Sequence, residues 1–178
     1  MSQIADHLKE IIEQAFILRL SGLEGDEIKV DMPYKSYVVK FNDDFNSGVV
    51  TSHYFPGALI LEEAGFKDYK LDGFYVLKGQ DGKDRFVKQY KGGVLNGTSI
   101  HYSVAGLKLT EKNYSGGMEN GEEIVYWRDA EKISQKITWD SGKKVKVINY
   151  IYATQRANSP NLKLTGIETN DGNNNLIE

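Results

Sequence analysis

The residues best suited to acid–base or metal chemistry are three histidines and three pairs of adjacent acids. They are His7, His53, His101, Asp43-Asp44, Glu62-Glu63 and Glu122-Glu123. Neighbouring residues on a strand point to opposite faces, so two adjacent carboxylates do not form an acid–base pair on their own. Neither His53 nor His101 has a second His or a carboxylate at metal-ligand spacing, and no Gly-x-Ser-x-Gly motif marks a nucleophile. We therefore predict a chain that is not an enzyme, with no catalytic residue, no metal and no cofactor.

The same acids suit a binding surface better than a reaction centre. Asp43, Asp44, Glu62 and Glu63 lie in or near predicted turns, and we interpret them as an acidic patch that engages a basic partner. The alternative is a set of solvated turns. Three aromatics, Tyr102, Tyr126 and Trp127, are the second group of candidate partner-binding residues, because Tyr and Trp are enriched at interface hot spots. Their alternative role is packing on the face of a sheet.

The charge balance narrows the class of partner. The chain has 178 residues and a net charge of −3, with acids in excess over residues 1–72 and bases in excess over residues 73–178. A nucleic-acid-binding domain usually carries a strongly basic face, so we expect no nucleic-acid partner. Five lysines in the stretch 132–146 suit either a solvated strand face or a patch for an acidic partner. The absence of cysteine excludes disulfides, Cys-ligated zinc and a Cys nucleophile.

The elements that must position these residues begin with a helix. Residues 2–20 carry an apolar stripe at helical spacing, made of Ile4, Leu8, Ile11, Ile12, Ala15 and Phe16. Acids fill its other side, which is why we expect it to cover a sheet rather than a membrane surface. The first residues do not have the basic start and the apolar run that are typical of a signal peptide. The longest apolar runs in the sequence are four residues. We expect a cytoplasmic protein.

Residues 33–150 then repeat with a period of 24 or 25 residues. A small or acidic residue followed by Gly recurs at positions 47–48, 72–73, 96–97 and 120–121. An aromatic follows 17 or 18 positions after each of these glycines: Phe66, Tyr90, Tyr114 and Trp139. Gly supplies the positive φ of hairpin turns, and Asn-Gly or Asp-Gly is a strong hairpin signal. Each unit is therefore predicted to be strand, tight turn, strand, tight turn.

Two strands per unit predict a mainly β fold. We expect an antiparallel up-and-down sheet of about nine strands, built from hairpin repeats of about 24 residues, with the N-terminal amphipathic helix packed on it. Residues 1–150 are predicted to form a single domain, with the helix at 2–20 and the repeats at 33–150. Residues 151–178 are predicted to be a partly mobile C-terminal extension, although Leu162, Leu164 and Ile167 suit one more strand.

The repeat resembles a known family. The 24-residue spacing and the stretches Tyr90-Lys91-Gly92-Gly93-Val94-Leu95-Asn96-Gly97 and Tyr114-Ser115-Gly116-Gly117-Met118-Glu119-Asn120-Gly121 are similar to MORN-variant repeats. The resemblance implies an antiparallel β-repeat sheet used for binding. It also implies a toxin–antitoxin or immunity role, which bacterial members often carry, or a membrane or scaffolding role as in eukaryotic relatives.

These observations lead to two functional hypotheses. The first is a non-enzymatic protein-binding module, immunity- or antitoxin-like, which neutralises a partner protein such as a basic toxin domain. The alternative is a peripheral membrane or scaffold protein that binds anionic lipid through the basic stretch 132–146. An enzyme with a cryptic site is the least supported hypothesis, because no group of residues argues for it.

Overall fold

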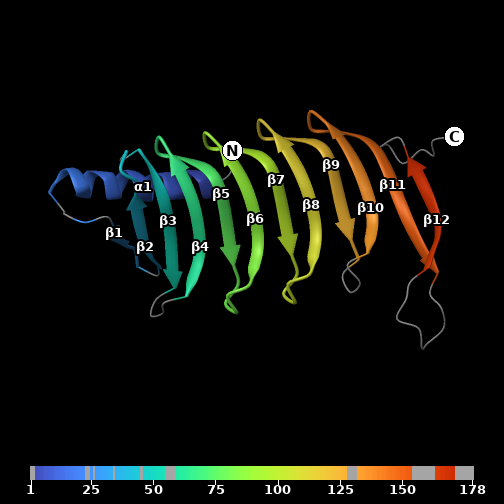
Figure 1. Ribbon diagram of the computed structural model, residues 1–178, viewed down its shortest axis with the longest axis horizontal. Coiled ribbons are helices and arrows are strands. Elements are labelled where there is room, and N and C mark those ends of the chain that lie inside the picture. The colour runs from blue at the N-terminus through green and yellow to red at the C-terminus, as the bar shows by residue number, and fades with distance from the viewer. Residues whose placement is uncertain are drawn as a thin grey trace. The chain divides into compact units, whose positions relative to one another are not determined.

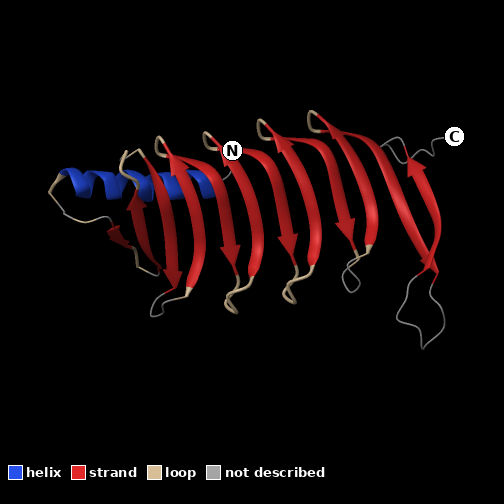
Figure 2. Ribbon diagram, in the orientation of Figure 1, coloured by secondary structure: helices blue, strands red, loops and turns tan. Residues whose placement is uncertain are grey.

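The chain folds into one helix and an antiparallel sheet. The computed structural model describes residues 3–22, 25, 27–33, 35–44, 46–54, 59–127, 132–153 and 163–170. These contain α1 (Gln3–Leu20) followed by strands β1 (Glu27–Asp31), β2 (Lys35–Phe41), β3 (Ser47–Tyr54), β4 (Ile60–Lys67), β5 (Lys70–Lys78), β6 (Asp84–Lys91), β7 (Val94–Tyr102), β8 (Lys108–Ser115), β9 (Met118–Tyr126), β10 (Ile133–Asp140), β11 (Lys143–Ala153) and β12 (Lys163–Asn170). Figure 2 shows this change from helix to strands along the chain.

The strands are ordered in the sheet as they occur in the sequence, which is the predicted up-and-down topology. The expectation of about nine strands was too low: the repeat region itself forms the ten strands β2 to β11, and β1 and β12 are added at its two ends. The chain divides into two compact units, Met1–Gly97 and Thr98–Glu178. In the first unit β1 to β6 pair antiparallel with their neighbours. In the second unit β8 to β12 do the same.

The core of the first unit lies between α1 and the sheet. The helix lies across the strands and contacts β1, β2 and β5 (Figure 1). Its predicted stripe is buried at Leu8, Ile11, Ile12 and Ala15, and each fully buried aliphatic side chain contributes about 1.5–3 kcal/mol. The sheet side of this core consists of side chains that alternate along the strands, including Val39, Val50, Ala64, Phe66, Leu71 and Tyr75.

Tight turns close one end of the hairpins. At 92–93 and 116–117 both central residues are glycines with positive φ, between 56° and 86°. This is the type I′ geometry, whose twist matches that of the flanking strands. Ser141 and Gly142, and also Asp68 and Tyr69, adopt positive φ at the equivalent places. The predicted alternation of strands and tight turns is therefore confirmed, with turns at 92–93, 116–117 and 141–142.

The Asp-Gly and Asn-Gly pairs have another role than the one predicted. Gly73 lies within β5 and not in a turn, at φ 86°, where the pairing with β4 shifts register between Ala64 and Phe66. The residue is part of a β-bulge of the kind in which a glycine adopts positive φ. Asp72 beside it accepts a hydrogen bond of 2.9 Å from the backbone N–H of Gly92. Gly73 thus allows β5 to bend, and Asp72 binds the backbone of the turn that follows β6.

Candidate functional site

The three histidines lie on three different elements. His7 on α1 contacts Tyr37 on β2, with 2.6 Å between Nε2 and Oη. His53 lies on β3, and His101 lies on β7 in the part of that strand that belongs to the second unit. Within the described ranges, no three His, Asp or Glu side chains converge as metal ligands.

Asp43 and Asp44 are exposed in the loop between β2 and β3. Asp44 accepts hydrogen bonds from the Ser47 hydroxyl at 2.9 Å and from the backbone N–H groups of Asn46 and Ser47 at 3.0 Å. The Ser47 hydroxyl is the main cause that lowers the pKa of the Asp44 carboxyl. This carboxylate therefore shapes its own loop, while Asp43 faces solvent.

Glu62 and Glu63 lie on opposite sides of β4, as the alternation of a strand requires. Glu63 is half-buried and pairs with Val76 on β5. Glu62 is 8% exposed and lies in the core side of the first unit. It accepts hydrogen bonds from Ser52 Oγ at 3.0 Å and Tyr75 Oη at 3.1 Å, and its Oε2 lies 3.3 Å from Lys35 Nζ. The structure therefore does not bring the four predicted acids together as one surface patch.

Alkaline pH is expected to destabilise the first unit through its buried tyrosines. Burial, followed by the charge of Glu62, raises the pKa of Tyr37 to about 12 and also raises the pKa of Tyr75. The unfolded phenols titrate near pH ~10, so this stability is complete below pH ~10 and is lost as the pH rises through about 12. Urea unfolding at about pH 8 and about pH 11 measures the loss. Tyr37→Phe is expected to reduce this loss of stability at alkaline pH. An unchanged loss in the variant would contradict its assignment to ionisation of Tyr37.

The second unit carries a row of tyrosines on one face of its sheet. Tyr126 on β9 is opposite Ile133 on β10, and Lys108 on β8 interacts electrostatically with both Tyr102 and Tyr126. Tyr150 on β11 occupies the same level, because Val125 and Asn149, the residues before Tyr126 and Tyr150, both pair with Gln135. We call Tyr102, Tyr126 and Tyr150 the tyrosine row. Two of its members were predicted as contact residues.

An aliphatic row accompanies the tyrosine row. The repeated motif is Ile-x-Tyr, at 100–102, 124–126 and 148–150. Ile124 pairs with Glu111 on β8 and with Lys136 on β10, and Lys136 in turn pairs with Ile148. The two rows are half-buried and form one band of aromatic and aliphatic side chains. Tyr150 and the isoleucines were missed by the sequence analysis, although their 24-residue spacing was visible in it.

The opposite face of the second unit is organised around Trp139 on β10. The ammonium groups of Lys112 and Lys144 lie 4.8 and 5.5 Å from the centre of its ring. Trp139 Nε1 donates a 2.7 Å hydrogen bond to Glu123, which also forms an ion pair of 3.2 Å with Lys112. The Trp139 side chain therefore already binds neighbouring side chains of its own sheet.

The basic stretch 132–146 is divided between these two faces. Lys144 lies with Trp139, whereas Lys136 and Lys146 lie on the face of the tyrosine row, because they pair with Ile124 and Thr138. The strands therefore do not place all of these lysines on one face as a single patch for lipid. Within the described residues, no helix has the length and apolar character that a membrane crossing requires.

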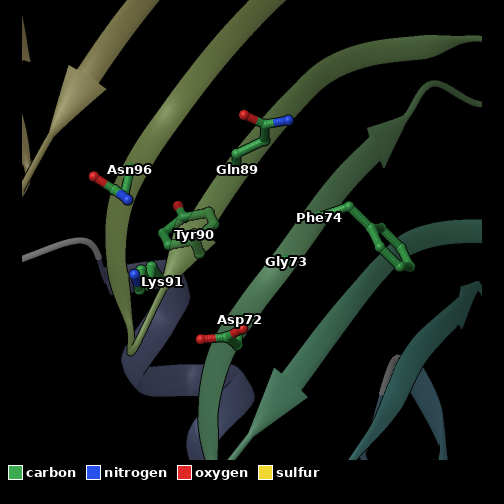
Figure 3. A pocket seen from close by; sticks show the side chains of 7 residues that line it. All are labelled: Asp72, Gly73, Phe74, Gln89, Tyr90, Lys91 and Asn96. Atoms are coloured by element: carbon green, nitrogen blue, oxygen red, sulfur yellow. The ribbon is translucent and has the colours of Figure 1, made fainter.

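The first unit has a hollow of about 360 Å³ beside the bulge of β5. Asp72, Gly73, Phe74, Gln89, Tyr90, Lys91 and Asn96 line it (Figure 3). Phe74 is 39% exposed and lies on the side of the hollow away from Asn96 (Figure 3). Its lining combines a carboxylate, an ammonium group, two amides and two aromatic rings. Trp127, the last predicted contact residue, follows β9 in the second unit and is 45% exposed.

The fold and these sites define a class of architecture: an up-and-down antiparallel sheet of hairpin repeats with one helix packed on its first strands. Comparison with protein-family models and with curated proteins found no match. The geometry of the faces is therefore the basis for any functional conclusion.

Proposed function

We propose that this chain is a non-enzymatic protein-binding module that contacts its partner through the tyrosine row of the second unit. The observation that carries the proposal is the Ile-x-Tyr motif, which appears three times on one sheet face. Tyrosine adds a large apolar contact area and a hydroxyl at a low cost in side-chain entropy, and it is enriched among hot spots. A hydrogen-bonded sheet holds these side chains in place before the partner arrives, which lowers the entropic cost of binding.

Within this class we favour an immunity- or antitoxin-like role, in which the chain neutralises a partner protein in the cytoplasm. The support is the resemblance to MORN-variant repeats together with the small acidic chain. Co-production offers a test, because a toxic partner captured by the module is expected to lose its toxicity when both are expressed together. Persistent toxicity despite a stable complex contradicts the neutralising role.

The lipid-binding alternative has weaker support, because the lysines of the basic stretch point to both faces. We expect no flotation with vesicles that contain phosphatidylglycerol. Strong flotation that is lost in Lys136→Glu favours this alternative over a protein partner.

Replacing Tyr126 with alanine is expected to weaken the complex at least about 10-fold, since truncation of a central aromatic removes a hot spot. The partner is first found by placing a photo-crosslinking phenylalanine analogue at Tyr126, and at Tyr114 as the control. Tyr114 lies on another strand of the same unit and is also half-buried. The affinity of the purified partner is then measured by calorimetry for wild type and for Tyr126→Ala.

Met118→Ala is the matched control for affinity. This side chain is 51% exposed at a turn of the same unit and lies outside the row. It is expected to change the affinity less than about 2-fold. Equal crosslinking from Tyr126 and Tyr114, or equal losses in Tyr126→Ala and Met118→Ala, contradicts the proposed surface.

A further inference from the structure

We propose that the segment bound by the tyrosine row is an acidic amphipathic α-helix that lies across the strands. This inference rests on the proposed function and specifies the secondary structure and charge of the partner. The surface is the band formed by the tyrosine row, by Ile100, Ile124 and Ile148, and by Lys136 and Lys146 on the same face.

A sheet face offers no free backbone groups to a bound segment. The N–H and C=O groups of β8 to β11 are used in their own ladders. An extended segment laid on this face would lose the hydration of its peptide groups without gaining partners for them. A helix satisfies its own backbone and presents only side chains. The face of a sheet therefore selects a helix, whereas a sheet edge selects a strand.

The spacing of the tyrosines matches the repeat of a helix. The tyrosines stand on alternate strands, and neighbouring strands lie about 4.8 Å apart, so successive tyrosines are about 9.5 Å apart. Side chains seven residues apart in a helix are separated by about 10.5 Å along its axis. A helix of about 16 residues thus covers the three tyrosines with one apolar residue near each. The parallel isoleucine row accepts the positions three or four residues further on.

The chain itself already contains a helix that lies across strands of the repeat. In the first unit α1 lies across the strands and buries Leu8, Ile11, Ile12 and Ala15, which have this same helical spacing. Its 18 residues contact β1, β2 and β5. Strands of this repeat therefore accept a helix that lies across them. In the first unit the helix covers the face of Phe66 and Tyr90, which corresponds to the face of Trp139 in the second unit, so α1 is a precedent for the orientation of the helix and not for the face that it covers.

The charge of the band predicts the charge of the partner helix. Glu111 in the isoleucine row is neutralised by Lys108, with 2.8 Å between Nζ and Oε2. Lys136 lies between Ile124 and Ile148, and Lys146 lies opposite Thr138. Among the described residues, no carboxylate forms an ion pair with either of these two lysines. Glu122 also lies on this face, opposite Thr138, and it is exposed. Lys136 and Lys146 outnumber this one carboxylate that is not ion-paired, so the band keeps a net positive charge, which an acidic helix complements.

The test uses full-length protein and three synthetic peptides of about 18 residues. The probe is a fluorescein-labelled amphipathic helix with a Leu and Ala stripe at i, i+3, i+4 and i+7, and with Glu at the flanking positions. In one control peptide Lys replaces every Glu, and in the other a central Pro breaks the helix. Fluorescence anisotropy is expected to show saturable binding of the probe and at least about 10-fold weaker binding of both controls.

Variants of the protein locate the binding. Lys136→Glu and Tyr126→Ala are each expected to weaken the probe about 10-fold. Lys143→Glu is the matched control, because Lys143 pairs with Asp140 at a turn outside the band, and it is expected to leave the affinity within about 2-fold. Circular dichroism confirms that each variant is folded.

Several results would overturn the inference. Equal binding of the helical and the Pro-containing peptide excludes a helix, and equal effects of Lys136→Glu and Lys143→Glu exclude this band. A dimer in analytical ultracentrifugation that dissociates in Tyr126→Ala identifies a second copy as the occupant. Flotation with phosphatidylcholine–phosphatidylglycerol vesicles that depends on Lys136 identifies a membrane. If the probe fails while crosslinking at Tyr126 still captures a protein, the helix is wrong and the proposed function stands; if both fail, both are wrong.

Discussion

Replacing Glu62 with alanine is expected to lower the free energy of unfolding by about 3 kcal/mol. The carboxylate accepts hydrogen bonds from Ser52 and Tyr75, which are each 1% exposed. Without it, two buried hydroxyls lose their acceptor, and each such loss costs about 1–3 kcal/mol. Lys35 contributes less, because its side chain is 39% exposed and regains water. Urea unfolding followed by circular dichroism measures the change.

Glu63→Ala is the matched control for this prediction. It removes the same chemical group from the next residue, on the other face of β4, and is expected to cost less than about 1 kcal/mol. A second variant separates lost hydrogen bonds from lost volume. In a Glu62→Leu background, Ser52→Ala together with Tyr75→Phe removes the stranded hydroxyls and is expected to restore part of the stability. Equal losses for Glu62→Ala and Glu63→Ala would contradict the buried network.

Glu62 also shows what sequence alone can establish. The alternation of a strand correctly places Glu62 and Glu63 on opposite faces. Strand alternation does not tell which of the two glutamates is buried. Burial depends on the partners of Glu62, Tyr75 and Lys35, which β5 and β2 bring next to it. The helix was easier to predict, since its apolar stripe is local and its burial needs only some flat surface to cover.

The last unit of the repeat was harder to predict than the helix, because its bulge differs from the bulges of the earlier units. Between β8 and β9, Lys112 pairs with Glu123 and Tyr114 pairs with Glu119, so the bulge adds two residues to one strand. Between β10 and β11, Ile137 pairs with Val147 and Trp139 pairs with Lys144, so only one residue is added. The last unit therefore has no glycine at the bulge. The glycine spacing therefore ends before Tyr150, whereas the 24-residue spacing of the tyrosines continues to it.

The repeated glycines do not share one role either, although the sequence analysis grouped them. Gly73 permits the positive φ of a bulge, while Gly48 lies in a regular strand, opposite Phe41 on β2 and Phe66 on β4. A β-carbon at Gly48 would collide with the backbone carbonyl oxygen of Lys40 and would lie 2.8 Å from Cζ of Phe66. Gly48 is required by space between strands, which a single sequence does not reveal.

Gly48→Ala is therefore expected to destabilise the protein by about 3 kcal/mol, in the upper range for overpacking a core. The collision involves backbone, so rotating a side chain does not relieve it, and β2 and β3 must separate locally. Thermal unfolding measures the loss. The control is Gly92→Asn, at a turn with φ of 56° and no atom within 4 Å of an added β-carbon. Asn tolerates this conformation, so the cost is expected to stay below about 1 kcal/mol. Equal costs for Gly92→Asn and Gly48→Ala would contradict the steric requirement at Gly48.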